Sequence, residues 1–449
     1  MRRDTPAVRM RITSIELFER DVRLRMPFRF GVVTLTRAPQ AFVRCRIATE
    51  DGREAEGASA ELLAPKWFDK DPALSDEDNV EQLRGSLRAA RDCYLARGAA
   101  TAWQHATPAR GLVANYGPAL LDKAVLDALC RALGVSFFEA VRRNLIGAEP
   151  LEGIDLPGVL AGLRPGVAIA ARHTVGLVDP LTAADVGQRV GDGLPEALEE
   201  VVARYGQRYF KLKVAGNVAS DVERLCAIAS VLDRIRGPYH ASLDGNEQYE
   251  DMQGVAELWA AMKAEPRLAR MMGSILFIEQ PVKRQKALEI KIPENIEKPV
   301  IIDESDDAID AFPRAKALGY KGVSSKTCKG LYKSLVNFAR CKAWGPEYFM
   351  TGEDLTIQPG LALQQDLALV SVLGLTHVER NGHHYVNGMA GLPAEEQEAF
   401  RASHPDLYER SHGAVRVRIR DGNLAIGSLG CKGFASAAMP DWTSMREMK

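Results

Sequence analysis

The sequence predicts a closed (β/α)8 barrel that follows a smaller α+β domain, and two observations support this fold class. From residue 169 to 381, eight short runs of apolar and β-branched residues alternate with helical patterns. Strands that alternate with helices are joined by crossovers into a parallel sheet, and eight such units suit a closed barrel. Residues 12–60 instead resemble an antiparallel meander. An open doubly wound sheet is the alternative, but no GxGxxG or GxxxxGKS/T motif marks a strand-to-helix turn.

Each element can be placed in chain order. The meander strands are expected at 13–24, 39–52 and 53–61, and two helices follow at about 73–98 and 118–144. The barrel strands are expected at 169–177, 209–214, 239–246, 275–281, 299–305, 322–328, 347–354 and 375–381. Helical patterns at 221–236, 254–265 and 330–344 lie between them. The tail from about residue 386, which contains the strand-like run 414–427, is expected to fold back onto the first domain.

Composition limits the classes of partner. Lys and Arg (58) nearly balance Asp and Glu (59) in the 449 residues, so no overall field favours nucleic acid or an anionic membrane surface. No apolar stretch has the length of a membrane span, and the start of the chain lacks a signal-peptide core. The seven cysteines form no CxxC or Cys/His cluster, which is typical of reduced thiols. We therefore expect a cytoplasmic protein and a homo-oligomer.

Charged residues stand at the ends of five consecutive barrel strands, where the loops of such a barrel converge on one mouth. The second strand ends with Lys211 and Lys213, and the sixth ends with Lys326. The three strands between them end with Asp244, Glu279 and Asp303. A single KxK pair is usually a solvated strand face, and a single carboxylate usually caps a helix. Five strand ends in a cation–anion–cation order instead predict a functional site.

A metal ion is expected among the three carboxylates. Asp244, Glu279 and Asp303 would repel one another in a partly dry site unless a dication held them together. Oxygen-only ligation points to Mg²⁺, with Mn²⁺ as the alternative, rather than to zinc.

The motifs "KLK", "LDGN", "FIEQP", "IDES" and a lysine at the next strand end resemble the enolase superfamily. The resemblance is to its muconate-lactonizing-enzyme-like subgroup, within the mandelate racemase/muconate lactonizing enzyme family. It implies a modified TIM barrel with an N-terminal α+β capping domain that is completed by the C-terminal segment. The corresponding ranges are 1–150 for the capping domain, 151–385 for the barrel and 386–449 for the C-terminal segment.

The resemblance also implies roles for individual residues. Asp244, Glu279 and Asp303 correspond to the metal ligands, and Asn246 to an accessory polar residue beside the metal. Lys213 corresponds to a base on one face of the substrate, and Lys326 to an acid or base on the other. Lys211 corresponds to the residue that helps to depress the pKa of Lys213.

Elementary chemistry agrees with these roles. Removal of a proton next to a carboxylate gives an enediolate, whose charge a metal stabilises. A lysine with its ordinary pKa of about 10.4 cannot act as a base at neutral pH, but a nearby dication and a second ammonium favour the neutral amine. The expected reaction on a small carboxylate substrate is racemisation, epimerisation or cycloisomerisation. β-Elimination on the same site is the alternative, and a Schiff-base aldolase or a non-catalytic metal-binding barrel would fit less well.

Several assignments stay open from the sequence. Glu304 adjoins Asp303 and should face the opposite way along the strand. Lys329 is a rival of Lys326, and Glu353 is either a site residue or a helix cap. His383 and His384 follow the last strand, where we expect solvated loop positions. Residues 26–36 and 59–68 are the expected lid, with Phe28 and Trp67 as its apolar substrate contacts.

Overall fold

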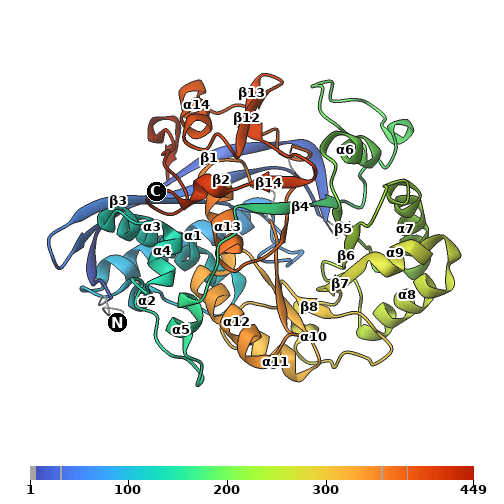
Figure 1. The fold of residues 1–449 in the computed structure, drawn as a ribbon, viewed down its shortest axis with the longest axis horizontal. Helices are drawn as coiled ribbons and strands as arrows, with labels where there is room; N and C mark the ends of the chain where they lie inside the picture. The colour runs from blue at the N-terminus through green and yellow to red at the C-terminus, as the bar shows by residue number, and fades with distance from the viewer. Residues whose placement is uncertain (1–6, 31–32, 355–356, 382, 449) are drawn as a thin grey trace.

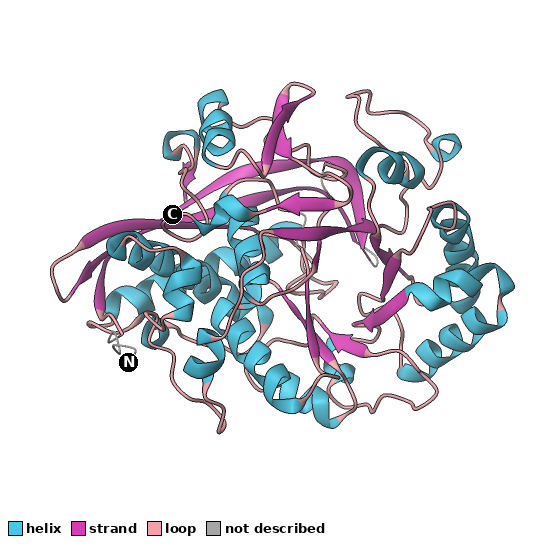
Figure 2. Ribbon diagram, in the orientation of Figure 1, coloured by secondary structure: helices cyan, strands magenta, loops and turns pink. Residues whose placement is uncertain are grey.

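In the computed structural model, which describes residues 7–30, 33–354, 357–381 and 383–448, the chain begins with a long antiparallel sheet. Strands β1 (Met10–Phe30), β2 (Val33–Thr49) and β3 (Glu54–Leu62) form the predicted meander. Strand β15 (Arg446–Glu447) pairs with β1 at the outer edge of this sheet. Figures 1 and 2 show β1 and β2 passing over the rest of the molecule.

Helices cover one face of this sheet. Helix α1 (Asp76–Ala96) begins with a capping box between Ser75 and Asp78. Helix α3 (Leu112–Leu133) is buried around most of its circumference, as expected of a helix that is enclosed on several sides. The shorter helices of this part are α2 (Ala102–His105), α4 (Phe137–Arg142) and α5 (Leu156–Ala161).

The second of the predicted helices starts earlier than expected. The prediction began at Pro118, but α3 extends six residues further toward the N-terminus and includes this proline. A proline inside a helix leaves the carbonyl four residues earlier without its N–H partner. Here the Ser86 hydroxyl donates to that carbonyl, of Ala114, at 3.2 Å and accepts from the Gly117 amide at 3.0 Å. A side chain of α1 therefore supplies the contact that the proline removes.

Eight parallel strands close into a barrel, as predicted. Neighbouring strands pair in sequence order, and the eighth strand pairs with the first, where Glu379 is opposite Arg172. The strands are β4 (Ala168–Val175), β5 (Tyr209–Lys213), β6 (His240–Asp244), β7 (Ile275–Glu279), β8 (Val300–Ile302), β9 (Gly322–Ser325), β10 (Phe349–Gly352) and β11 (His377–Glu379). Their residues are buried along nearly their whole length because the helices cover the outside of the barrel.

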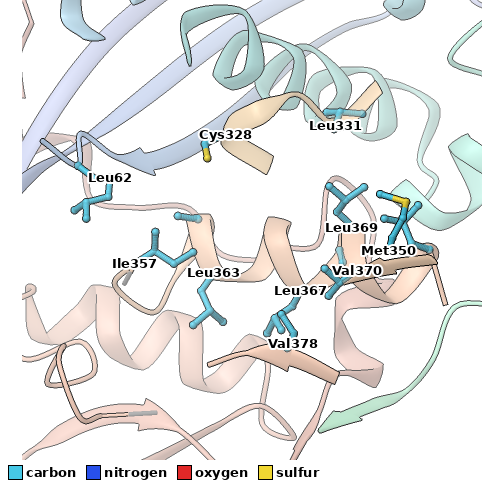
Figure 3. Close-up of a cluster of buried hydrophobic side chains, with 14 of the residues drawn as sticks. Leu62, Cys328, Leu331, Met350, Ile357, Leu363, Leu367, Leu369, Val370 and Val378 are labelled. Carbon is cyan, nitrogen blue, oxygen red and sulfur yellow. The ribbon is translucent and has the colours of Figure 1, made fainter. Parts of the chain in front are cut away.

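The barrel helices lie around the strands in Figure 1, and all three predicted helical patterns are found there. They are α6 (Leu198–Tyr205), α7 (Val218–Leu232), α8 (Met252–Ala264), α9 (Ala269–Ser274), α10 (Arg284–Ala287), α11 (Ala311–Ala317), α12 (Leu331–Trp344) and α13 (Leu361–Val372). The side chains of α13 pack in the buried cluster of Figure 3, near Val378 of β11 and Cys328. Gln365 of α13 also donates to the carbonyl of Ala58 in β3 at 2.8 Å, which ties the barrel to the first sheet.

The C-terminal segment contacts both parts of the chain. Helix α14 (Ala394–Ser403) is followed by a hairpin of β12 (Tyr408–Ser411) and β13 (Ala414–Val417). Strand β14 (Asn423–Ala425) pairs with the first residues of β4, before the range in which β4 pairs with β5. The C-terminal segment thus folds back onto the first domain as expected, through β15 and through contacts such as Arg20 with Glu396 and Phe434 with Asp127. Its strand β14 instead pairs with β4, whose start offers a free strand edge. Among the described strands of this segment, β15 is the one that joins the first sheet.

Within the part of the chain that the structure describes, no helix combines the length and the apolar character needed to cross a membrane. The seven cysteines are free thiols, as predicted.

The packing of β3 on α3 depends on a glycine. A β-carbon at Gly57 would lie 2.2 Å from the amide nitrogen of Ala128 and 2.4 Å from the carbonyl oxygen of Ala124. Both atoms belong to the backbone of α3, so no side-chain rotation can relieve the clash. We expect Gly57→Ala to lower the free energy of unfolding by about 3 kcal/mol in urea titrations. Gly98→Ala is the matched control, because its β-carbon would have no described atom within 4 Å. Equal stability of the two variants would contradict the packing described here.

Candidate active site

The three predicted carboxylates lie side by side at one end of the barrel. Asp244 ends β6 and is opposite Glu279, which ends β7, while Asp303 directly follows β8. Lys213 ends β5 and is opposite Asp244. All four side chains are buried. The order of charged strand ends that the sequence predicted is therefore an order of neighbours in space.

Lys211 forms the centre of the ion-pair network. Its ammonium nitrogen lies 2.9 Å from Asp244 Oδ2, 3.0 Å from Glu279 Oε1, 2.7 Å from Glu353 Oε2 and 3.1 Å from Glu379 Oε2. Burial alone would lower the pKa of Lys211, but the four carboxylates together raise it well above its ordinary value. The four carboxylates thus favour the charged form of Lys211.

Lys213 has a smaller set of partners. Its ammonium lies 2.6 Å from Asp244 Oδ2 and 2.5 Å from the side-chain oxygen of Asn246. The same oxygen of Asp244 therefore serves both lysines of the strand. Burial opposes ionisation of Asp244, but the two ammonium groups hold its pKa below the usual value. The like charges of "KLK" are placed together by one shared carboxylate.

Lys326 and Lys329 contact Asp303 from two sides. Lys326 donates to Asp303 Oδ2 at 2.5 Å, and its ammonium lies 4.2 Å from the centre of the Trp67 ring. Lys329 donates to Asp303 Oδ1 and to the Asp303 carbonyl, both at 3.1 Å, and to the Ser324 hydroxyl at 2.8 Å. Although burial opposes it, these two ammonium groups hold the pKa of Asp303 well below its usual value. Lys329 belongs to a short turn after β9, over Thr327–Lys329, and is buried rather than part of an open loop.

Lys326 and Lys213 line the same small cavity, of about 30 Å³, whereas Lys329 does not. The strands that carry them, β9 and β5, are separated in the sheet by β6, β7 and β8. The two ammonium groups thus approach the cavity from opposite sides of the carboxylate-bearing strands. Of the two rival lysines, Lys326 has the position from which a group could reach a substrate in this cavity.

The deeper part of the barrel holds charged residues that sequence reasoning missed or left open. Arg172 of β4 pairs with Glu353 and donates to the Gly352 carbonyl at 2.9 Å. Glu379 ends β11, and its side chain also accepts from the Thr174 hydroxyl. Glu353 is fully buried between Arg172 and Lys211, so it belongs to this network and does not cap a helix. Glu379 could have been predicted, because it is a charged residue at the end of the eighth strand. Arg172 lies within its strand, and no sequence pattern indicates its role.

The expected lid residues cover the cavity. Phe28, Phe30, Leu35, Ala64 and Trp67 line it opposite the lysines. The Lys213 ammonium lies 5.8 Å from the centre of the Phe28 ring. Gly31 and Val32 of the predicted lid segment lie outside the described residues. The cavity therefore has an aromatic roof and a charged floor.

Two cations fix the second lid segment to the barrel. Arg284 donates to the backbone carbonyls of Phe68 at 2.8 Å and Trp67 at 3.0 Å, and it pairs with Glu247 at 2.8 Å. Lys70 lies 2.5 Å from Glu247 and 3.3 Å from Glu304. Glu304 also accepts from the Asn246 amide at 3.2 Å, so it faces the lid side and not Lys326. These non-local contacts hold Trp67 over Lys326.

His383 and His384 are not solvated, contrary to the expectation. Both side chains are buried, and the Nε2 atom of His384 lies 3.4 Å from a carboxylate oxygen of Asp179. The same carboxylate accepts a hydrogen bond from Tyr385 at 2.5 Å. The segment after β4 covers these histidines, a contact that no local sequence pattern indicates.

The three carboxylates fit a hard dication by their chemistry. Among the described residues, no group of three or more His, Cys, Asp or Glu side chains is already arranged to hold a metal, because the lysines lie against the carboxylates. Glu279 Oε2 is buried and has no hydrogen-bond partner in the described part of the chain. Burial, followed by the neighbours Asp244 and Glu353, raises the pKa of Glu279 well above its usual value. Lys211 contacts only one oxygen of Glu279 in the described structure, and a metal ion would supply positive charge at the other.

The contacts of Arg284 lead to a prediction about the lid. Arg284→Met removes charged hydrogen bonds to the segment around Trp67, and such bonds contribute about 1.5–3 kcal/mol each. We expect amide deuterium exchange of residues 66–70 to become at least about tenfold faster. Arg267→Met removes an exposed arginine that pairs with Glu223 and should leave this exchange unchanged. Unchanged exchange in Arg284→Met would show that other contacts hold the lid.

No protein-family model matches the chain, and no curated protein matches it. Several solved structures do match it over nearly the whole length of both chains. A member of the enolase superfamily from Roseovarius nubinhibens ISM, complexed with magnesium, has a TM-score of 0.59 at 16% identity and covers 98% of this chain and 99% of its own. The muconate lactonizing enzyme from Pseudomonas fluorescens has a TM-score of 0.61 at 18% identity, with coverage of 97% and 98%.

The L-Ala-D/L-Glu epimerase from Bacillus subtilis has a TM-score of 0.60 at 14% identity, with coverage of 95% of this chain and 99% of its own. At such identities the likeness concerns the fold. The chain therefore has the fold of enolase superfamily members, a modified TIM barrel with a capping domain.

Proposed function

We propose that the chain is a magnesium-dependent enzyme of the enolase superfamily that removes the α-proton of a small carboxylate substrate. One observation carries the proposal: Lys213 and Lys326 line one cavity from opposite sides of three neighbouring carboxylates. Each of the two lysines is paired with an outer carboxylate of the set, Asp244 or Asp303. Two amines on opposite sides of a substrate can exchange protons with its two faces.

Asp244, Glu279 and Asp303 are the residues that would hold the metal ion, for which Mn²⁺ is the alternative to Mg²⁺. When bound, the ion supplies positive charge that stabilises the negative charge developing on the substrate carboxylate. The partnerless oxygen of Glu279 supports this assignment. A Roseovarius nubinhibens structure with the same fold is complexed with magnesium.

The lysines have different roles in this proposal. Lys211 stays charged, because four carboxylates surround it, and it orients Asp244 and Glu279. Lys213 shares the Oδ2 atom of Asp244 with that cation, and its ammonium lines the cavity. Lys213 then accepts the α-proton on one face, and Lys326 exchanges a proton on the other. Lys329 holds Asp303 in place from outside the cavity.

Two reaction outcomes follow from the same first step. If both lysines exchange protons, the configuration of the α-carbon inverts, as in a racemase or epimerase. If one lysine acts only as electrostatic support, cycloisomerisation or β-elimination becomes the expected outcome. An epimerase and a muconate lactonizing enzyme both share the fold, which supports inversion and cycloisomerisation as outcomes. The aromatic roof favours a substrate with an apolar group near its carboxylate.

Exchange of the α-proton with solvent deuterium tests the proposal. NMR should detect exchange in a panel of N-acyl amino acids, dipeptides, α-hydroxy acids and unsaturated diacids, and chelation with EDTA should abolish it. General acid–base groups contribute about 10²–10⁴-fold to rate, so Lys213→Ala and Lys326→Ala should each lose exchange from one enantiomer by at least about 100-fold. The exposed Lys263, which pairs with Glu297, provides the control Lys263→Ala. Unchanged exchange in both active-site variants would remove the lysines from the chemistry.

A further inference from the structure

A second cavity, of about 470 Å³, lies between the first domain and the barrel, away from the lid. Helices α2 and α3 form one side of it, and the turn at Lys329 and helix α12 form the other. Its size falls in the range of sites for small molecules, about 300–1,000 Å³. The proposed function does not use it. No residue of its lining contributes to the cavity beneath Phe28 and Trp67.

The lining is mostly apolar. Trp103, Pro108, Pro118, Leu151 and Val336 contribute to it. The rings of Trp103 and Tyr332 meet edge to face, with centres 5.4 Å apart, so the cavity has an aromatic corner. A wall of this kind suits a flat apolar group, since it offers contact area without requiring hydrogen bonds.

One buried cation at the wall has spare hydrogen-bonding capacity. The Lys333 ammonium donates to the Asp306 carbonyl and lies 3.2 Å from Asp306 Oδ2. An ammonium has three donors, and the described residues supply no further acceptor for this one. The Lys333 side chain is 9% exposed, and burial lowers its pKa. A negative group in the cavity would satisfy the remaining donor and stabilise the charged form.

Two carboxyl residues line the cavity: Glu149 is exposed to solvent, and Asp122 is buried. Asp122 accepts a hydrogen bond from Tyr94 at 2.7 Å, and burial raises the pKa of Asp122 to about 7. Near neutral pH a large share of this group is therefore uncharged. Lys329 is already surrounded by Asp303, Ser324 and Asp306, which leaves Lys333 as the cation available to a ligand.

We propose that this cavity binds a small aromatic carboxylate, with its ring in the apolar corner and its carboxylate on Lys333. A chain of contacts leads from this point to the active site. Lys333 pairs with Asp306 at 3.2 Å, Asp306 with Lys329 at 3.3 Å, and Lys329 with Asp303 at 3.1 Å. A carboxylate on the remaining donor of Lys333 adds a negative charge at one end of this chain of contacts, so occupancy should also alter the surroundings of Asp303. That consequence rests on the proposed function, whereas binding itself does not.

Crystals of the full chain soaked with 4-bromobenzoate locate the ligand directly. We expect a bromine anomalous peak beside Trp103 and Tyr332, with the carboxylate at Lys333. A peak only beneath Phe28 and Trp67, or no peak at all, would overturn the proposal. This measurement needs no variant and does not depend on any enzymatic activity.

Calorimetric titration with benzoate tests the role of the ammonium in solution. A hydrogen bond to a charged group is worth enough that Lys333→Met should weaken binding at least about tenfold. Lys213→Met, which changes the other cavity, should leave this affinity unchanged. Benzyl alcohol, which lacks the charge, should bind the wild type more weakly than benzoate does. Equal affinity of wild type and Lys333→Met, or loss of binding in Lys213→Met alone, would place the ligand elsewhere.

Discussion

The ammonium group of Lys211 is the contact on which the interior of this barrel depends. It joins carboxylates from four different strand ends, those of β6, β7, β10 and β11. A charge without a partner in a dry interior costs several kcal/mol, and breaking a buried pair typically costs about 3–5 kcal/mol. Lys211 therefore allows four neighbouring strand ends to carry buried carboxylates, because it pairs with all four of them. Its position in turn fixes Asp244 and Glu279 as neighbours.

The charges in this interior are balanced, and the balance has a chemical consequence. Positive and negative side chains are equal in number in the central network. The members are Asp244, Glu279, Asp303, Glu353 and Glu379, and Lys211, Lys213, Lys326, Lys329 and Arg172. A dication would add two positive charges, and a substrate carboxylate would return one of them. Under the proposed function, the loaded site would therefore carry one more positive charge than the network described here.

Much of the fold and of the central site followed from the sequence, because both depend on local patterns. Alternating strand and helix signals placed all eight barrel strands, and a charge at each of five strand ends located Lys211, Lys213, Asp244, Glu279 and Lys326 together with Asp303. Parallel strands bring such positions together whatever the loops do. The same reasoning applied to the eighth strand would have found Glu379.

Contacts between distant segments were beyond sequence reasoning. The anchoring of the lid needs Lys70 and Arg284 to meet at Glu247, and nothing in their local sequence indicates it. The burial of His384 depends on Asp179, which lies in a segment far away in the chain. Strand β14 pairs with β4 because a free edge exists there, which only the assembled barrel reveals. In each case the decisive partner is set by three-dimensional packing.

The central proposal is that one metal ion binds among Asp244, Glu279 and Asp303. Crystals grown with Mn²⁺ test it directly, since the anomalous signal of manganese locates the ion without reference to activity. The account predicts a single strong peak within about 2.3 Å of an oxygen atom of each of the three carboxylates, with Glu279 Oε2 among the ligands. A peak held by Glu353 and Glu379 instead, or no peak at these three carboxylates at saturating Mn²⁺, would contradict it.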